Sequence, residues 1–507
     1  MAEMQEAAGE GTVQTEENTL DSILAKVNLD RPADGVSIDR FKDVSGVGDN
    51  ERSGMMAAAI KVFVEAVGEL DQPVQKVDKG LLDGMISAID AKMSSQLDEI
   101  LHNEKFQQLE SSWRGVKLLV DRTDFRKNVK IELLHMTKEE AADSFEDSPE
   151  LIQSPIYKKI YSEAYDQPGA DPYAAIISGY EFNSSAADIA LLSNFSKVAA
   201  SSHCPFIGSV GPKFFGKDSM EEWKKIPDLG AYMETADFTK WNSFRNTEDA
   251  RYVGLTFPRF MARLPYDEEN NPVKGFNYNE GVKGKDHDKY LWGNASYTFA
   301  ANMVKAFASD GWSVQIRGPK AGGMVDDLPV HLFDAGKGKE MKTPSEVPID
   351  ETLEFQCSNL GFMPLSHYKD KDYACFFSAN SAQKPVEYDD ADATANSRVN
   401  SRLPYIFLAA RISHYLKVMQ RENIGATKDK NLIQAELNKW LKGLVTEMEN
   451  PSATQVAKYP LKAAEVVVDD IEDNPGFFSI RTMIKPHFQI EGMDISLSLV
   501  GKLPKAK

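Results

Sequence analysis

Near its C-terminal end the chain reads FSIRTMIKPHFQIEGMDISLSLV, from Phe478 to Val500, and apolar residues alternate through it. Alternation with a period of two is typical of β-strands that bury one face. Lys485-Pro486 and the run Glu491 to Asp494 interrupt the alternation, which predicts strands joined by turns. The strand positions that could link neighbouring chains are Phe478, Ile480, Ile484, Phe488, Ile490, Ile495, Leu497 and Leu499.

Strands so close to a chain terminus suggest assembly. An unpaired strand edge presents free N–H and C=O groups that can pair with another chain. The alternative is a hairpin that satisfies these groups within its own domain. The sequence leaves both possibilities open.

The segment before these strands is strongly acidic. Pro460 to Asp473 is predicted to begin as a helix and to stop at Asn474-Pro475-Gly476. Its acids, which could meet a basic surface on a partner, are Glu465, Asp469, Asp470, Glu472 and Asp473. A solvated helix end is the alternative. Upstream, helical spacing of apolar residues predicts helices at Leu403 to Gln420 and Leu432 to Leu444.

From about residue 150 to 380, short strand-like runs alternate with helical ones, which predicts a mixed α/β or α+β body. The clearest strands are Ala174 to Tyr180 and Pro205 to Val210, and the clearest helices are Asp188 to Ser201 and Ala295 to Ser309. Polar composition predicts loops at Tyr266 to Lys289 and Asp334 to Pro344, and a connection from Ser378 to Arg402.

The N-terminal part differs in character. Residues 1–54 are predicted to be a flexible acidic arm. Three amphipathic helices follow between about 55 and 122. The first carries the stripe Ile60, Phe63, Val67 and Leu70, and the third carries Phe106, Leu109, Trp113, Val116 and Val120. These stripes could pack within their own domain, or the first could form a groove for a partner helix.

A strand is predicted at Val129 to Met136. Thr137 followed by Glu140 predicts a capping box that opens a short helix.

The composition limits the function classes. The chain has 507 residues with a net charge of −19, so non-specific binding to nucleic acid phosphates is disfavoured. Its apolar fraction of 42% excludes wholesale disorder. Three cysteines cannot form a disulfide framework, and no run of about 18 apolar residues predicts a membrane span. A reducing cytoplasm is the expected compartment.

Several motifs resemble catalytic or ligand-binding sites. Gly211 to Asp218 has the spacing of a phosphate-binding loop, but Asp218 replaces the hydroxyl residue that would hold Mg²⁺. The Gly-rich loop Arg317 to Gly323 is a weak anion cradle, and Asp286-His287-Asp288 a weak metal site. His414 is expected to be a packed core histidine. No cofactor and no metal site is predicted.

Seven strings along the chain carry a family resemblance. In order they are LESSWRG at Leu109–Gly115, GLTFPRFMARLPY at Gly254–Tyr266, WGNA at Trp292–Ala295, IRGPKAGGMVDDLP at Ile316–Pro329, NLGFMPL at Asn359–Leu365, ATAN at Ala393–Asn396 and RLPY at Arg402–Tyr405. This ordered set resembles the large subunit of the type VI secretion contractile sheath, the TssC/VipB family. The resemblance covers residues 55 to 500.

The resemblance implies a structural protein rather than an enzyme, in the cytoplasm of a Gram-negative bacterium. Such subunits pair with a small sheath subunit and polymerise as a helical tube around an inner tube of hexameric rings. Contraction propels that tube out of the cell. Contacts with a baseplate are implied, and an AAA+ unfoldase dismantles the sheath, mainly through the small subunit. A nucleotide-dependent enzyme using Gly211 to Lys217 is the alternative.

The expected fold is a mixed α+β or α/β, multi-domain sheath protein with a phage-tail-sheath-like inner domain and C-terminal strands. Four parts are predicted: the arm 1–54, a helical region 55–128 that could bind the small subunit, an outer and middle body 129–380, and an inner domain 381–507 with interlacing strands. By resemblance, the acids before those strands face the inner tube.

Overall fold

The computed structural model describes residues 79–489, apart from 274, 277, 337, 447, 449, 471–477 and 488. The predicted arm and the first apolar stripe (Ile60, Phe63, Val67 and Leu70) therefore lie outside the described residues. The chain divides into two compact units. The first comprises Met1–Glu110 and Pro265–Val282, and the second Ser111–Leu264 and Lys283–Lys507. The four-part division expected from the sequence stays a prediction.

The first unit contains helix α4 (Lys79–Leu101), which the sequence predicted, and the irregular segment 265–282. Glu280, which is 2% exposed, joins the two. Its carboxylate contacts Nε2 of His102 at 3.0 Å and accepts a hydrogen bond from the backbone N–H of Tyr266 at 2.9 Å. The Tyr278 hydroxyl also donates to the carboxylate of Asp98. Partly buried hydrogen bonds thus hold a segment that has no regular secondary structure.

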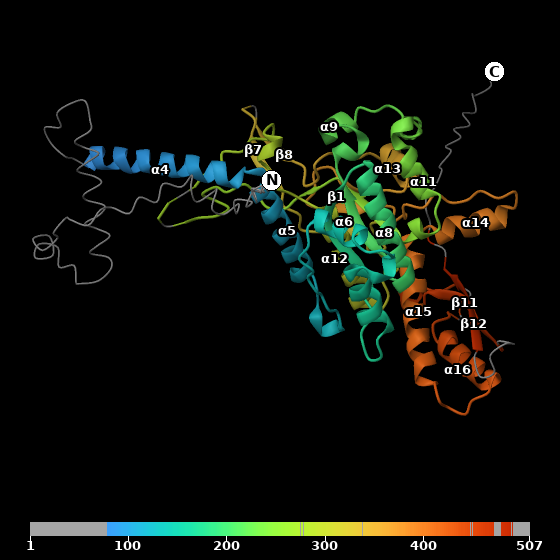
Figure 1. Ribbon diagram of the computed structural model, residues 1–507. Helices are drawn as coiled ribbons and strands as arrows, with labels where there is room; N and C mark the ends of the chain where they lie inside the picture. The colour runs from blue at the N-terminus through green and yellow to red at the C-terminus, as the bar shows by residue number, and fades with distance from the viewer. Residues whose placement is uncertain are drawn as a thin grey trace, which may run out of the picture. The chain divides into compact units, whose positions relative to one another are not determined.

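A six-stranded sheet organises the second unit (Figure 1). Its order is β1 (Ile176–Phe182), β2 (Phe206–Val210), β3 (Val253–Phe257), β9 (Met363–His367), β10 (Ala374–Phe376) and β6 (Met324–Val325). The first four strands are parallel, and the last two are antiparallel to their neighbours. The mixed α/β body and its two predicted strands, β1 and β2, are confirmed.

Helices cover both faces of this sheet, which explains why strands β2 and β3 are buried at every position. Phe206 and Ile207 point to opposite faces of β2. Phe206 belongs to a core that includes helix α8 (Ala186–Ser202). Ile207 belongs to a second core, with α12 (Ala295–Asp310) and the start of α15 (Leu403–Glu422). All three helices were predicted within a few residues.

A third core lies where α15 meets the C-terminal elements. The second half of α15, helix α16 (Lys430–Lys442) and the antiparallel strands β11 (Leu461–Asp470) and β12 (Phe478–Pro486) bury apolar side chains together (Figure 1, orange to red). The predicted helix at 432–444 and the predicted strand from Phe478 are confirmed as α16 and β12.

The helix predicted from Pro460 to Asp473 is wrong, because its described part contains strand β11, Leu461–Asp470. Val466, Val467 and Val468 are β-branched and favour a strand. Val466 and Val468 are buried and point to one face, so the segment follows a period of two rather than 3.6.

The strand predicted from Val129 to Met136 is also wrong. No strand pairs with this segment among the described residues, and side chains of other segments contact it instead. The Tyr180 hydroxyl donates to the carbonyl of Met136 at 2.7 Å, and Tyr173 donates to the carboxylate of Glu132.

Two predicted loops contain regular structure. Asp334 to Pro344 was predicted as a loop, but it includes the turn and second strand of a hairpin, β7 (His331–Asp334) with β8 (Lys339–Lys342). Gly336, at φ +81°, supplies the left-handed conformation that this turn requires. The connection from Ser378 to Arg402 contains helix α14 (Ala391–Asn400), with Asp390 as its N-cap. Both segments are rich in polar residues, and this composition led to the incorrect loop predictions.

Two further predicted helices are confirmed as α5 (Glu104–Asp121), which carries the third apolar stripe, and α6 (Lys138–Glu146). The sequence did not assign the smaller elements individually. The smaller helices are α7 (Pro155–Tyr157), α9 (Met220–Trp223), α10 (Leu229–Met233), α11 (Thr239–Arg245), α13 (Glu351–Asn359) and α17 (Ala453–Lys458). Short strands β4 (Phe260–Met261) and β5 (Trp292–Gly293) pair with each other. Single helical turns are η1 (Phe125–Lys127), η2 (Leu151–Gln153), η4 (Pro212–Phe215), η5 (Ala236–Phe238), η6 (Asp249–Tyr252) and η7 (His287–Lys289), and η3 (Lys158–Asp166) is a π-helix.

Two local predictions are confirmed. Thr137 and Glu140 form a reciprocal capping box at the start of α6. His414 is buried, and its Nε2 contacts the carbonyl of Ser202 at 2.9 Å. No helix within the described part of the chain is long and apolar enough to span a membrane.

Candidate assembly surface at the C-terminal hairpin

Strands β11 and β12 form a two-stranded ribbon that packs on helix α16. The register places Val466 opposite Thr482 and Val468 opposite Ile480. Helix α16 presents Ile433, Leu437 and Leu441, spaced four residues apart, to the apolar face of the ribbon. A two-stranded sheet is marginal alone, so this packing supplies much of its stability.

Side chains of α16 cover the outer edge of β11. Oδ1 of Asn438 accepts a hydrogen bond from the N–H of Val466 at 2.9 Å, and its Nδ2 donates to the carbonyl of Val466 at 2.8 Å. One turn earlier, Oε1 of Gln434 accepts from the N–H of Val468 at 3.1 Å. The two amides take the place of a neighbouring strand, so this edge is closed to other chains.

The outer edge of β12 has a different environment. Val466 directs its backbone polar groups away from β12, so the pair Val466 and Thr482 is of the type without mutual hydrogen bonds. Thr482 therefore also directs its N–H and C=O outward. Ile480 and Ile484, which lie two residues before and after Thr482, do the same. Within the described residues, no hydrogen bond reaches these outward groups. This edge can accept a further strand.

The predicted strand residues divide into two groups. Phe478, Ile480 and Ile484 lie on β12, half-buried against the third core. The others lie outside the described residues; they are Phe488, Ile490, Ile495, Leu497 and Leu499. Whether any of them contacts a second chain stays a prediction.

Two of the predicted acidic contacts already have partners. Asp469 forms an ion pair with Arg481 of β12 at 2.6 Å, and Asp470 one with Lys430 of α16 at 2.7 Å. The hydrogen bond that Lys430 donates to Asp470 raises the pKa of Lys430. Glu465 lies on the same strand, whereas Glu472 and Asp473 lie outside the described residues. Contact of these acids with an inner tube stays a prediction.

The later apolar stripes of the helical region do not fully pack within the described chain. On α4, Ile86 and Ile89 are 48% and 49% exposed. On α5, Leu109 and Trp113 are 56% and 60% exposed. Large exposed apolar side chains in rows of this kind are typical of surfaces that a partner covers.

The Gly211 to Lys217 loop does not have the structure of a phosphate site. Phe214 and Phe215 are completely buried in the first core. The N–H groups of Phe214 and Gly216 donate to loop carbonyls, both at 3.1 Å, so they are not available to a phosphate. A Cβ on Gly211 would also meet the carboxylate of Glu181. The nucleotide-enzyme alternative is not supported.

The other two motifs are structural turns. In the Arg317 to Gly323 loop, Gly318 donates its N–H to the carbonyl of Phe376 at 2.7 Å, and Gly323 donates to Gly318 at 2.9 Å. His287 stacks on Trp292, and its Nε2 contacts the carboxylate of Glu346 at 3.1 Å. No cluster of three possible metal ligands occurs within the part of the chain that the structure describes.

Sequence reasoning missed the roles of Asn438 and Gln434. Both look like ordinary polar residues of an amphipathic helix. Their spacing of four places them on one face of α16, but no sequence signal connects them with strand residues about thirty positions later.

Comparison with known proteins gives a consistent result. Residues 83–383 match the VipB family model, described as the EvpB/VC_A0108 tail sheath N-terminal domain, and residues 392–503 match VipB_2, the EvpB/VC_A0108 tail sheath gpW/gp25-like domain. The chain is 42% identical over 430 residues to the type VI secretion system sheath protein TssC1 of Pseudomonas aeruginosa, covering 84% of this chain and 86% of that protein.

Solved structures give weaker likenesses. An anti-feeding prophage baseplate structure has a TM-score of 0.35 at 10% identity, covering 74% of this chain and 83% of that chain. The sheath complex of an extracellular contractile injection system, PVC, in its contracted state has a TM-score of 0.32 at 9% identity. This likeness covers 60% of this chain and 67% of that chain. The assignment depends on the family models and on the relative. The chain therefore belongs to the VipB family of tail sheath proteins, and it is a structural subunit of a type VI secretion sheath.

Proposed function

We propose that this chain pairs with a small sheath subunit and polymerises as a helical tube around an inner tube, and that the outer edge of β12 receives a strand from a neighbouring subunit. Contraction of the polymer, rather than bond-making chemistry, then performs the work. The sheath assembles in the cytoplasm and contacts a baseplate, and an unfoldase dismantles it mainly through the small subunit.

The difference between the two outer edges of the β11–β12 ribbon is the observation that supports the proposal. One edge is capped by Asn438 and Gln434, while the other presents the outward groups of Ile480, Thr482 and Ile484. Each backbone hydrogen bond contributes about 0.5–1.5 kcal/mol net, so three or four bonds hold a neighbour, and repetition along a helix multiplies the effect. A shared strand also acts as a hinge, which lets neighbours change spacing without separating.

The direct test replaces one outward N–H. Thr482→Pro removes a donor on the outer edge and none that faces β11, so the ribbon is retained. We expect co-expression of this variant with the small subunit to yield heterodimers but few hollow tubules in negative-stain micrographs. Thr482→Ala keeps the N–H and should form normal tubules. Normal tubules from Thr482→Pro, and from a chain truncated after Gly476, would overturn the strand exchange.

The inner-tube contact needs its own variant. Reversing Asp469 or Asp470 would also break its pair with Arg481 or Lys430, which confuses the readout. Glu465 forms no ion pair within the described residues, so Glu465→Lys tests the contact more cleanly. We expect the variant to form fewer sheaths that contain an inner tube than wild type does, whereas the number of empty sheaths should not change. An equal share of tube-containing sheaths for wild type and Glu465→Lys would contradict this contact.

The small-subunit contact concerns residues on the predicted first helix. We expect Ile60→Asp or Phe63→Asp to abolish co-purification of the small subunit, because a charge in an apolar contact is costly. Val67 and Leu70 would extend the same stripe. Retained co-purification would place the contact elsewhere, for instance on the exposed rows of α4 and α5.

A further inference from the structure

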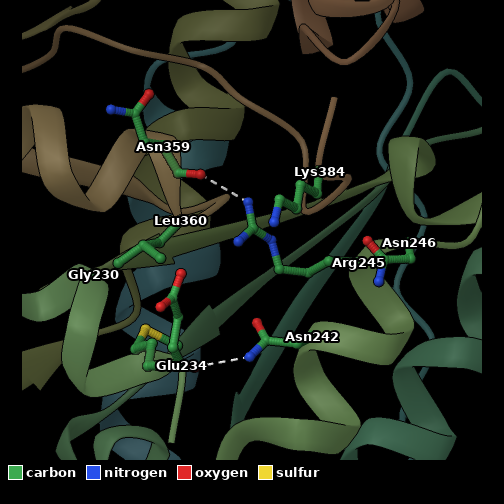
Figure 2. A pocket seen from close by; sticks show the side chains of 9 residues that line it. Gly230, Glu234, Asn242, Arg245, Asn246, Asn359, Leu360 and Lys384 are labelled. Carbon is green, nitrogen blue, oxygen red and sulfur yellow. Dashed lines mark hydrogen bonds between the residues drawn. The ribbon is translucent and has the colours of Figure 1, made fainter. Parts of the chain in front are cut away.

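A pocket of about 300 Å³ lies on the second unit, away from the hairpin, and it contains a buried cation (Figure 2). Helices α10 and α11, the end of α13 and the segment after β10 form its walls. Its charged lining residues are Arg245, Lys384 and Glu234, and its amides are Asn242, Asn246 and Asn359.

Arg245 is 4% exposed, yet none of the described residues is an anionic partner for it. Its Nε donates to the carbonyl of Ala382 at 3.0 Å, and one terminal nitrogen donates to the carbonyl of Asn359 at 2.7 Å. Both acceptors are neutral, and Arg245 forms no ion pair with any described residue. Burial lowers the pKa of Arg245 to about 10. A buried charge without a counter-ion is costly.

The remaining terminal nitrogen faces the pocket. Figure 2 shows it turned away from Asn359 and toward the side lined by Leu360 and Glu234. Two hydrogen bonds to carbonyls fix the plane of the guanidinium, so this donor is held in place. A planar donor of this kind suits the oxygen of a carboxylate.

The net charge of the pocket lining favours a ligand that carries a single negative charge. Arg245 and Lys384 contribute two positive charges, and Glu234, exposed at the pocket, contributes one negative charge. The net charge of +1 matches a single carboxylate, whereas Glu234 would repel a multiply charged phosphate.

We propose that the Arg245 pocket binds a carboxylate, either of a small molecule or of an Asp or Glu side chain from a neighbouring sheath chain. The inference goes beyond the strand exchange and does not depend on it. The bound carboxylate supplies the counter-ion that Arg245 lacks.

The test uses trifluoroacetate as the probe, with ¹⁹F line width as the readout on the full-length chain. We expect wild type to broaden the line, acetate to reverse the broadening, and chloride at equal ionic strength not to reverse it. Lys384→Gln should weaken binding about two- to fivefold, as for an exposed charge, and Glu234→Gln should strengthen it by a similar factor. Lys224→Gln, an equal loss of charge at another exposed site, should change nothing.

Arg245→Gln should abolish the broadening if the variant folds; the Lys384 and Glu234 variants keep the test decisive if it does not. Failure of acetate to compete, or equal broadening by wild type, Lys384→Gln and Glu234→Gln, would overturn the proposal. If binding is found, a map of the assembled sheath identifies the source. An acidic side chain of a neighbour in the pocket indicates a protein ligand, and a pocket free of protein indicates a small carboxylate.

Discussion

The side chain of Asn438 forms both hydrogen bonds that a neighbouring strand would otherwise make with Val466. Its Oδ1 accepts from the N–H at 2.9 Å, and its Nδ2 donates to the C=O at 2.8 Å. Val466 is completely buried, so without Asn438 these two polar groups would have no partner. Helix α16 thus determines which edge of the ribbon stays open.

Asn438→Ala should therefore lower the free energy of unfolding by about 1–3 kcal/mol, because it leaves buried backbone groups unsatisfied. Chemical denaturation measures this. Asn438→Asp keeps the acceptor for the Val466 N–H but loses the donor, so it should also be destabilising. Lys439→Ala, exposed on the same helix, should change the stability by less than about 0.5 kcal/mol. Equal stability of Asn438→Ala and Lys439→Ala would contradict the edge-capping role.

The third core depends on α16 through Leu437, which is 1% exposed. Leu437→Ala should cost about 2–5 kcal/mol, since it removes buried apolar surface and leaves a cavity. Leu432→Ala on the same helix is the matched control, because Leu432 is 47% exposed and should lose little. Thermal and chemical unfolding of the two variants should separate them clearly. A small loss for Leu437→Ala would mean that the ribbon does not depend on this core.

Gly115 is placed against an aromatic ring. A Cβ there would lie 2.3 Å from Cδ2 of Tyr297. In an isolated helix, replacing Gly by Ala stabilises the helix by about 0.5–1 kcal/mol. Gly115→Ala should instead lower the free energy of unfolding by about 1–3 kcal/mol, because the added methyl group clashes with the ring. A double-mutant cycle with Tyr297→Leu checks the cause, since removing the ring should recover most of the loss. Loss of stability that persists in the double variant would exclude the clash as its source.

His414 makes stability depend on pH. Burial, then the nearby charges of Arg411, His203 and Lys417, lowers its pKa to about 4, although the hydrogen bond to Ser202 opposes this. The unfolded chain takes up this proton near pH 6.5, whereas the folded chain does so near pH 4. Stability is therefore full above pH 6.5 and falls by up to about 1.4 kcal/mol per pH unit as pH drops toward 4, roughly 3 kcal/mol in total.

His414→Gln removes this titration. Denaturation of wild type and variant from pH 7 to pH 4.5 should show a shallower decline for the variant. Parallel profiles would show that another group dominates the acid sensitivity.

The sequence by itself predicted the family, the mixed α/β body, and helices α8, α12, α15 and α16. The ordered strings from Leu109–Gly115 to Arg402–Tyr405 carried the family resemblance. The helices followed from long apolar patterns with a clear period, because such patterns depend on local geometry. It also predicted β12, where alternation over Phe478 to Ile484 is unambiguous.

Only the tertiary structure decided that α16 closes one edge of the ribbon, and that Arg245 lies in a pocket with no counter-ion among the described residues. The physical reason is that each depends on residues distant in sequence. Asn438 and Val466 are 28 positions apart, and Arg245 and Ala382 are 137 positions apart. A local pattern reports which face of an element is apolar, but not which distant group satisfies its polar atoms.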